Sequence, residues 1–341
     1  MKSIKFLAMA AIVSFGMVSC SDDDDNGGEI PSEDLRVELY ASSNTDGNVT
    51  KYDMSDMSNT TSEMFVTLST DSEGLYYDDD TNELTLSSRA PLQLNTYANI
   101  DAATDGVTLN ATISSSPVLL SPRDLAVNDD IYVVSDNADV DGDTTTNDGR
   151  LFVFVKGDNG FTLRNTVTVD FAVWGIEFVG NNLYAVVDKT NQLAVFTNFS
   201  ASNTTDATVA ASKTITVEGI VRTHGIGYDD GTMILTDIGD AAVDNDGGFH
   251  IITDFDSKFS GVADGGTLAV SDQVRVAGSN TFLGNPISAE FDSDTNTVFI
   301  AERANGGGRV LAFTNADAGG NIAPSVNNTL SGASSLYFYS E

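Results

Sequence analysis

Residues 175–198, GIEFVGNNLYAVVDKTNQLAVFTN, read as three short strands joined by two polar turns. Apolar and β-branched residues fill the strands, and Gly, Asn, Asp and Lys mark the turns. Two other stretches, DLAVNDDIYVVSDN (124–137) and GIGYDDGTMILTDIGD (225–240), repeat the same pattern. A pattern that recurs at intervals along a chain predicts a repeat architecture.

Each copy consists of an apolar strand, a short turn, a second strand of the form (I/L)Y(V/A)V, a polar turn and a third strand of the form (L/V)xVF. Five full copies begin near residues 74, 124, 175, 225 and 288, at a spacing of about 50 to 60 residues. Between copies lies a fourth apolar stretch: GVTLNATI, TLRNTVTV, SKTITVEG or DQVRVAG. Four antiparallel strands per unit at this period predict the blades of a β-propeller.

A sixth unit is split between the two ends of the chain. GASSLYFYSE at the C-terminus reads as a first strand, RVELYASSNTDGNVTKYD (36–53) as second and third strands, and MFVTLST (64–70) as an outer strand. Sharing one blade between both ends would close the ring and remove an open sheet edge. We therefore predict an all-β, six-bladed propeller of four-stranded antiparallel blades. A two-domain β-sandwich or a β-solenoid is the alternative, although a solenoid needs a shorter and stricter period.

The recurring pattern GI…(D/G)G.LYV.D…..V..F is similar to that of six-bladed propellers of the NHL and gluconolactonase-like kind. The likeness covers nearly the whole chain after its first residues and consists of structural positions, so it implies blades rather than chemistry. If activity followed, the resemblance would imply a divalent metal in the channel, with Glu177 or Glu290 as ligand and His224 in proton transfer.

The first residues form a processing signal rather than part of the fold. Lys2 and Lys5 precede the apolar run FLAMAAIVSFGMV, which is too short for a confident membrane span. MVSC, ending at Cys20, the only cysteine, resembles a bacterial lipobox; an ordinary secretory signal is the alternative. We therefore expect a signal peptide over residues 1–19, a lipidated Cys20 with an acidic tether over 20–36, and the propeller over 37–341.

The tether SDDDDNGGEIPSED is almost without apolar residues and must be solvated. Its acidic run two residues after the cysteine resembles the export signal of surface lipoproteins from Bacteroidetes-type bacteria. The resemblance implies an outer-membrane lipoprotein displayed on the cell surface, with a periplasm-facing lipoprotein as the alternative.

The charge of the chain narrows its partners. A formal charge of −34, from 50 acidic and 16 basic residues, repels nucleic acid and anionic headgroups. Cations, neutral glycans and basic partners stay open, and solubility in a salty medium is the alternative reason for the charge. We expect a monomer.

Binding residues in a propeller are sought where the turns into each first strand meet the turns between second and third strands. Trp174 and His224 each stand before a Gly-Ile pair in neighbouring repeats, so we expect both at the channel mouth. The alternative is a structural role for both side chains. The candidate ligand-binding residues are Arg123, Trp174, Arg222, His224 and Asn285. The second set of turns adds Arg89, Asp136, Asp188, Asp237, Glu302 and Arg303.

The stretch NADVDGDTTTND (137–148) matches a twelve-residue calcium loop. Hard oxygen donors at this spacing suit Ca²⁺, and Gly142 permits the sharp turn. The stretch resembles an EF-hand-type loop, but it begins with Asn, ends with Asp and lies between strands, and a merely solvated loop is the alternative. The predicted ligands are Asn137, Asp139, Asp141, the backbone carbonyl of Asp143, and Asp148.

The sequence contains no G-x-S-x-G, P-loop or H-E-x-x-H motif, and two histidines cannot build a His-rich metal centre. We expect a surface-anchored binding propeller for a glycan, peptide or protein ligand, with a structural calcium ion in a rim loop. The alternative is a metal-dependent hydrolase or lactonase acting in the channel, so whether the chain is an enzyme stays open.

Overall fold

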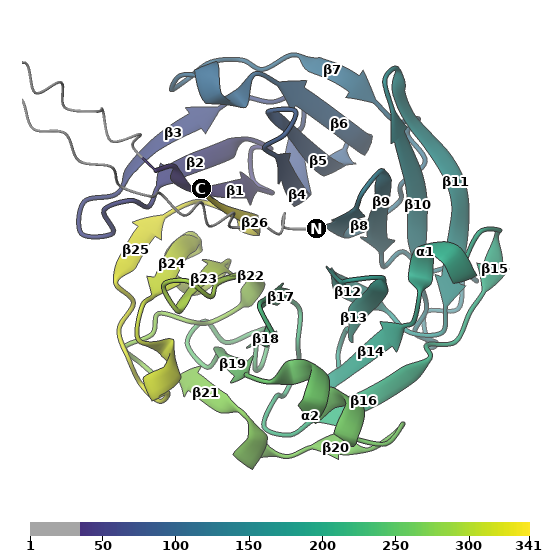
Figure 1. Ribbon diagram of the computed structural model, residues 1–341, viewed down its shortest axis with the longest axis vertical. Helices are drawn as coiled ribbons and strands as arrows, with labels where there is room; N and C mark the ends of the chain where they lie inside the picture. The colour runs from purple at the N-terminus through teal and green to yellow at the C-terminus, as the bar shows by residue number, and fades with distance from the viewer. Residues whose placement is uncertain (1–34) are drawn as a thin grey trace, which may run out of the picture.

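The computed structural model describes residues 35–341 and arranges them as six β-sheets around a central axis (Figure 1). Each sheet is one blade, and its first strand lies nearest the axis. The predicted six-bladed propeller is confirmed, and the β-sandwich and the solenoid are excluded. The predicted signal peptide and Cys20 lie outside the described residues.

Blades one to three contain the following strands. Blade one is β26 (Ala333–Ser340), β1 (Val37–Ser43), β2 (Val49–Asp53) and β3 (Thr61–Phe65). Blade two is β4 (Asp71–Asp78), β5 (Glu83–Ala90), β6 (Leu92–Ala98) and β7 (Ala111–Ser114). Blade three is β8 (Pro122–Asn128), β9 (Ile131–Asp136), β10 (Gly149–Gly157) and β11 (Gly160–Val169), with β15 (Ala207–Thr208) parallel to β11 at its edge.

Blades four to six follow the same plan. Blade four is β12 (Val173–Val179), β13 (Asn182–Val187), β14 (Gln192–Phe196) and β16 (Lys213–Val217), with β20 (Thr267–Leu268) parallel to β16. Blade five is β17 (Ile226–Asp229), β18 (Thr232–Asp237), β19 (Gly248–Ile252) and β21 (Val274–Ala277). Blade six is β22 (Pro286–Asp292), β23 (Thr297–Glu302), β24 (Arg309–Phe313) and β25 (Val326–Thr329).

Helices are short and lie in the connections. The α-helices are α1 (Phe199–Ser202) and α2 (Phe255–Gly261), and the 3₁₀ helices are η1 (Ile100–Ala102), η2 (Val270–Asp272), η3 (Asn305–Gly307) and η4 (Ala316–Ala318). Within residues 35–341, none of the helices has the length and apolar character needed to cross a membrane.

The ring closes in blade one, where the two ends of the described chain pair. β26 runs antiparallel to β1, with Val37 opposite Ser340, and the Glu341 backbone N–H donates to the Arg36 carbonyl at 3.1 Å. The split sixth unit of the sequence is therefore one four-stranded sheet. The last strand of the chain thus supplies the first strand of blade one, and every blade of the ring has a first strand.

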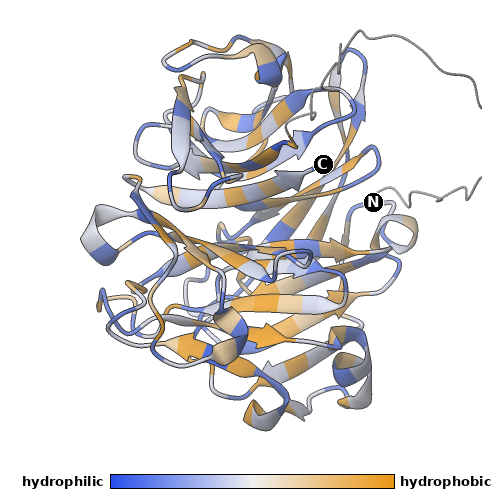
Figure 2. Ribbon diagram, turned by 60° about the vertical axis from the view of Figure 1, so that its left-hand side comes forward, coloured by the Kyte–Doolittle hydropathy of each residue, from blue (hydrophilic) through white to orange (hydrophobic). Residues whose placement is uncertain are grey.

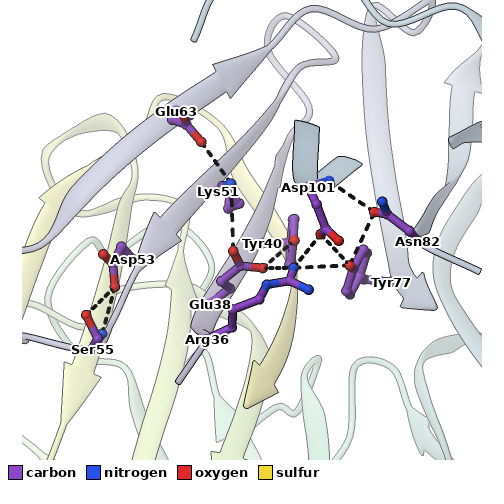
Figure 3. Close-up of polar contacts among 10 residues, drawn as sticks. All are labelled: Arg36, Glu38, Tyr40, Lys51, Asp53, Ser55, Glu63, Tyr77, Asn82 and Asp101. Atoms are coloured by element: carbon purple, nitrogen blue, oxygen red, sulfur yellow. Dashed lines mark hydrogen bonds and ion pairs between the residues drawn. The ribbon is translucent and has the colours of Figure 1, made fainter. Parts of the chain in front are cut away.

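A polar cluster fastens this closing blade to blade two (Figure 3). The Arg36 guanidinium lies 2.6 Å from both Glu38 and Asp101, and it donates to the Tyr77 hydroxyl at 3.1 Å. The Tyr40 hydroxyl donates to Glu38, and the rings of Tyr40 and Tyr77 stack 4.7 Å apart. Because these residues come from both blades, the cluster joins the first described residues to the body of the ring.

The core is divided into six apolar clusters, one between each pair of neighbouring blades. Strand β13 shows why its sequence is apolar throughout. Leu183 and Ala185 pack towards blade three, whereas Tyr184 and Val186 pack towards blade five, because successive side chains leave a strand on opposite faces. Blade strands are therefore covered on both faces, and the apolar stretches follow the strands in Figure 2.

His250 lies in β19, fully buried, with Nδ1 2.7 Å from Gln273 Oε1. Burial lowers the pKa of His250 to about 4, despite the opposing effect of Gln273. The folded-state pKa lies below the unfolded value, so the stabilising contribution is present above about pH 6.5 and is lost as the pH falls towards 4. The loss amounts to at most about 3 kcal/mol.

Gln cannot titrate, so we expect the free energy of unfolding of His250→Gln to lie below that of the parent by an amount that decreases as the pH falls from 6.5 to 4. Urea unfolding at several pH values measures this difference, because carboxylate titrations affect both proteins alike. A deficit that stays constant over this range would contradict a buried neutral imidazole.

Candidate functional site

The candidate site is the end of the central axis at which all six first strands begin. Because the strands of a blade alternate in direction, the turns between second and third strands lie at the same end. One residue at the start of each blade, at or just before its first strand and immediately before the Gly, Ser or Asp that opens the repeat, forms what we call the mouth ring. Its members are Ser334, Glu73, Arg123, Trp174, His224 and Ile287.

The mouth ring is continuous across five blades. Ser334 donates a hydrogen bond to Glu73, whose Oε1 lies 3.7 Å from Arg123. The Arg123 guanidinium carbon lies 4.3 Å from the centre of the Trp174 ring, and the Trp174 and His224 rings stack at 3.8 Å and 5°. The residues that stand in one column of the repeat therefore touch in sequence around the axis.

Local backbone geometry turns these side chains inward. The register between first and second strands shifts at this point in β4, β8, β12 and β22, as in a β-bulge. A bulge changes the direction of a side chain and often borders a functional site. The following Gly is required by close approach, since a Cβ at Gly175 would lie 2.4 Å from the His224 carbonyl oxygen.

Blade three has Asp124 in place of this glycine. Its carboxylate accepts hydrogen bonds from the backbone N–H groups of Ile176 in the next blade and of Leu125. Burial among the first strands raises the pKa of Asp124 to about 7, although the two N–H donors oppose this rise. The side chain therefore joins blades three and four, and its oxygens are used within the wall.

Trp174 is held between two neighbours rather than presented as an open face. Arg123 and His224 come from the blades on opposite sides of blade four, so each covers a different face of the indole. The indole N–H donates to no group within residues 35–341 and is not buried. Trp174 therefore offers a ligand its edge and one donor, not a stacking surface.

Asp188 fixes the position of His224. A single oxygen, Oδ1, lies 3.0 Å from His224 Nε2 and accepts hydrogen bonds from Arg222 Nε at 3.0 Å and Nη2 at 2.8 Å. Burial opposes ionisation of Asp188, but His224 and Arg222 together lower its pKa. Burial lowers the pKa of His224, against the effect of Asp188, so the imidazole is neutral near pH 7. Its Nδ1 is buried without a partner.

Glu73 meets two arginines on the other side of the mouth. Its Oε1 lies 3.5 Å from Arg89 and 3.7 Å from Arg123, and the charge of Arg303 also acts on it. The side chain is 1% exposed, and this burial raises the pKa of Glu73 against the effects of Ser334, Arg123 and Arg303. Glu73 and Ser334 were not among the sequence-derived candidates, although they stand in the repeat column of Trp174 and His224.

Several acids of the second set of turns have structural roles. Asp136, Asp237 and Glu302 are fully buried. Each accepts hydrogen bonds from at least two backbone N–H groups of the loop that enters its own blade, such as Leu120 and Ser121 for Asp136. Their oxygens hold these loops in place and are not directed at a ligand.

The predicted ligand-binding residues do not all meet. Arg123, Trp174, Arg222 and His224 form one group with Asp188. Asn285 instead donates to the Ala241 carbonyl oxygen at 3.4 Å, in the turn between β18 and β19. No contact joins Asn285 to the other four within the described residues.

Three of the predicted calcium ligands lie together. Carboxylate oxygens of Asp139, Asp141 and Asp148 lie within 4.8 Å of one another, an arrangement that can hold a metal ion. Asn137 Oδ1 accepts hydrogen bonds from Ser121 and from Arg123 Nε, so it is directed towards the mouth. The Asp143 carbonyl oxygen accepts from the backbone and the hydroxyl of Thr146. The sequence spacing therefore locates an acidic cluster of three of the five expected donors, and the oxygens of Asn137 and Asp143 are not part of it.

Neither a family model nor a curated protein matches this chain. Among solved structures, a chain of a nidogen/laminin complex aligns at a TM-score of 0.55 and 9% identity, covering 89% of this chain and 98% of the other. A proposed 6-phosphogluconolactonase from Bacteroides fragilis aligns at a TM-score of 0.55 and 10% identity, covering 91% and 99%. At these identities the likeness shows the propeller fold alone.

Proposed function

We propose that this chain is a surface-anchored lipoprotein whose propeller binds a ligand at the channel mouth. The lipobox ending at Cys20 and the acidic tether support the anchor and the outward display. The observation that carries binding is the group of Arg123, Trp174, His224 and Asp188, which come from blades three, four and five and meet at one end of the channel. Ligand sites in repeat folds are built in this way, from different residues at equivalent positions of a common scaffold.

Binding of residues 35–341 to arrays of glycans and peptides, repeated with Arg123→Ala, tests this proposal. We expect any ligand of the parent to bind the variant more weakly, because Arg123 is a member of the mouth ring. Asp80→Asn, in an exposed turn at the opposite end of the channel, is the matched control and should bind normally. Equal weakening by both variants, or by neither, would place the ligand elsewhere.

We also propose that Asp139, Asp141 and Asp148 hold a calcium ion that orders the loop over residues 137–148. This loop begins at Asn137, which is hydrogen-bonded to Arg123, so calcium would stabilise one side of the mouth. Carboxylates are hard oxygen ligands of the kind that Ca²⁺ prefers.

Thermal unfolding in calcium and in EDTA measures this effect. At a calcium concentration a hundred times the Kd, the parent should gain about 2.7 kcal/mol of stability, and Asp141→Ala should lose most of that gain. Asp246→Ala, in the acidic turn of blade five, is the control and should respond like the parent. An unchanged midpoint in the parent would contradict a calcium site.

Hydrolysis in the channel is the second candidate, favoured by one observation. Asp188 holds Nε2 of a neutral His224, an arrangement that leaves Nδ1 as a base. Glu177 and Glu290, the metal ligands implied by the family resemblance, stand two residues beyond the repeat-opening Gly175 and Ser288. They are therefore about 10 Å further along the first strands than the His224 level. Turnover of lactones by the parent, lost in His224→Gln, would favour hydrolysis over binding.

A further inference from the structure

Three arginines at the mouth carry more hydrogen-bond donors than their neighbours use. Arg123 donates a hydrogen bond from Nε to Asn137. Arg89 has only the long contacts to Glu73 at 3.5 Å and to Asp71 at 3.9 Å. Arg303 forms no side-chain hydrogen bond or ion pair within residues 35–341. A guanidinium has five N–H donors, so most of those in this group are unused by the protein.

The charges of Arg89 and Arg303 both act on Arg123. Burial lowers the pKa of Arg123, and the charges of Arg89 and Arg303 lower it further, against the effect of Glu73. Three acids oppose this repulsion: Asp71 lies 3.9 Å from Arg89, the charge of Asp188 acts on Arg123, and Glu73 contributes less because burial raises its pKa. An anion placed between them would relieve the repulsion.

The composition of the chain makes this cluster unusual. Only 16 of 341 residues are basic, against 50 acidic residues, yet Arg89 and Arg123 lie 3.5 and 3.7 Å from the same oxygen of Glu73, and the charge of Arg303 acts on Glu73 and Arg123. A positive site within an acidic protein favours anions locally, and the surrounding negative charge opposes unspecific anion binding. Arg222 does not belong to this group, because it forms a two-donor ion pair with Asp188.

We infer that Arg89, Arg123 and Arg303 bind an oxyanion group of a small organic ligand, a carboxylate, sulfate or phosphate, with the free indole N–H of Trp174 as a further donor. This inference rests on the proposed function and specifies the chemistry of its ligand. Guanidinium groups bind such anions through paired N–H bonds, which supply both affinity and orientation. The anionic group of the ligand would neutralise positive charge of the arginines beside Glu73.

Trp174 is the only tryptophan, so its fluorescence reports on the mouth directly. Inorganic sulfate and sodium D-galacturonate, titrated at constant ionic strength, test the sulfate-type and the carboxylate-type anion separately. Sodium chloride is the ionic control, and neutral D-galactose matches galacturonate in shape. We expect a saturating emission change with at least one oxyanion and none with galactose or chloride.

Arg303→Ala should lower the affinity for the oxyanion by about tenfold to a hundredfold, because charge-assisted hydrogen bonds are lost. Lys189→Ala removes an equal charge from an exposed turn at the same end of the channel and should change affinity by less than about threefold. Circular dichroism verifies that both variants fold.

The outcomes separate this inference from the proposed function. Saturating binding of galactose without binding of either oxyanion would overturn the oxyanion inference and leave the mouth as a binding face. Equal weakening by Arg303→Ala and Lys189→Ala would also overturn it, since only long-range charge would then matter. If array ligands bind but Arg123→Ala leaves them unaffected and Trp174 reports no probe, both proposals fall.

Discussion

Deletion of residues 333–341 is expected to prevent the chain from folding to a soluble propeller. The deletion removes β26, the first strand of blade one, together with its pairing to β1 and the burial of Leu336 and Phe338. Burial of two large apolar side chains contributes about 3 to 6 kcal/mol, and each lost strand hydrogen bond adds about 1 kcal/mol. The sum is comparable to the whole stability of a domain, about 5 to 15 kcal/mol.

A circular permutant is the matched control for this deletion. Joining Glu341 to Leu35 and opening the chain at the exposed bond between Ser116 and Pro117 makes β26 and β1 neighbours in sequence. This permutant should unfold cooperatively at a midpoint near that of the parent. A truncated protein that unfolded at the parent's midpoint would contradict closure of the ring by a shared blade.

Phe299→Ala should destabilise the propeller by about 3 to 5 kcal/mol, since a large buried ring is replaced by a cavity. Phe299 lies in β23, has no exposed surface, and stacks on Phe338 of β26 at 4.7 Å between ring centres. It therefore belongs to the apolar cluster that joins the last blade to the closing blade.

Phe282→Ala is the control of the same chemistry. Phe282 lies in the loop before β22 and is 37% exposed, so its removal should cost less than about 1 kcal/mol. Urea unfolding of both variants, with slopes equal to that of the parent, measures the difference. Similar losses in the two variants would contradict the assignment of Phe299 to a core between blades.

The fold could be predicted because its determinants recur. Leu183, Tyr184 and their equivalents are apolar in almost every copy, with Thr85 of blade two as an exception, since blades cover both faces of each strand. The divided sixth unit was visible because an unpaired first strand at one end matched unpaired second and third strands at the other. These features depend on period and hydropathy, which a sequence displays directly.

The mouth could be predicted only in part. Trp174 and His224 share a column of the repeat, and the structure stacks them. Glu73 and Ser334 share that column too, but neither has an aromatic ring or a positive charge that would mark it as a binding residue. The role of the acids at the ends of second strands could not be predicted from the sequence. A carboxylate that holds a loop through hydrogen bonds, such as Asp136, occurs at the same position of the repeat as one that binds a ligand.

Side-chain direction explains the remaining differences. Asn137 occupies the first position of a calcium-loop pattern, but its oxygen accepts a hydrogen bond from Arg123, fourteen residues earlier in the chain. Spacing along a sequence does not indicate whether an amide oxygen coordinates a metal ion or accepts a hydrogen bond from a neighbouring side chain. The arginine cluster likewise depends on bulges at the starts of first strands, which change side-chain directions without a fixed sequence signature.

The most direct test of the account is a crystal structure of residues 35–341 with the ligand that binds most tightly in the array or fluorescence experiments. We predict density for an anionic group within hydrogen-bond distance of Arg89, Arg123 and Arg303, at the end of the ring where the first strands begin. Density at the opposite end, or on the outer strands with the mouth unchanged, would contradict it.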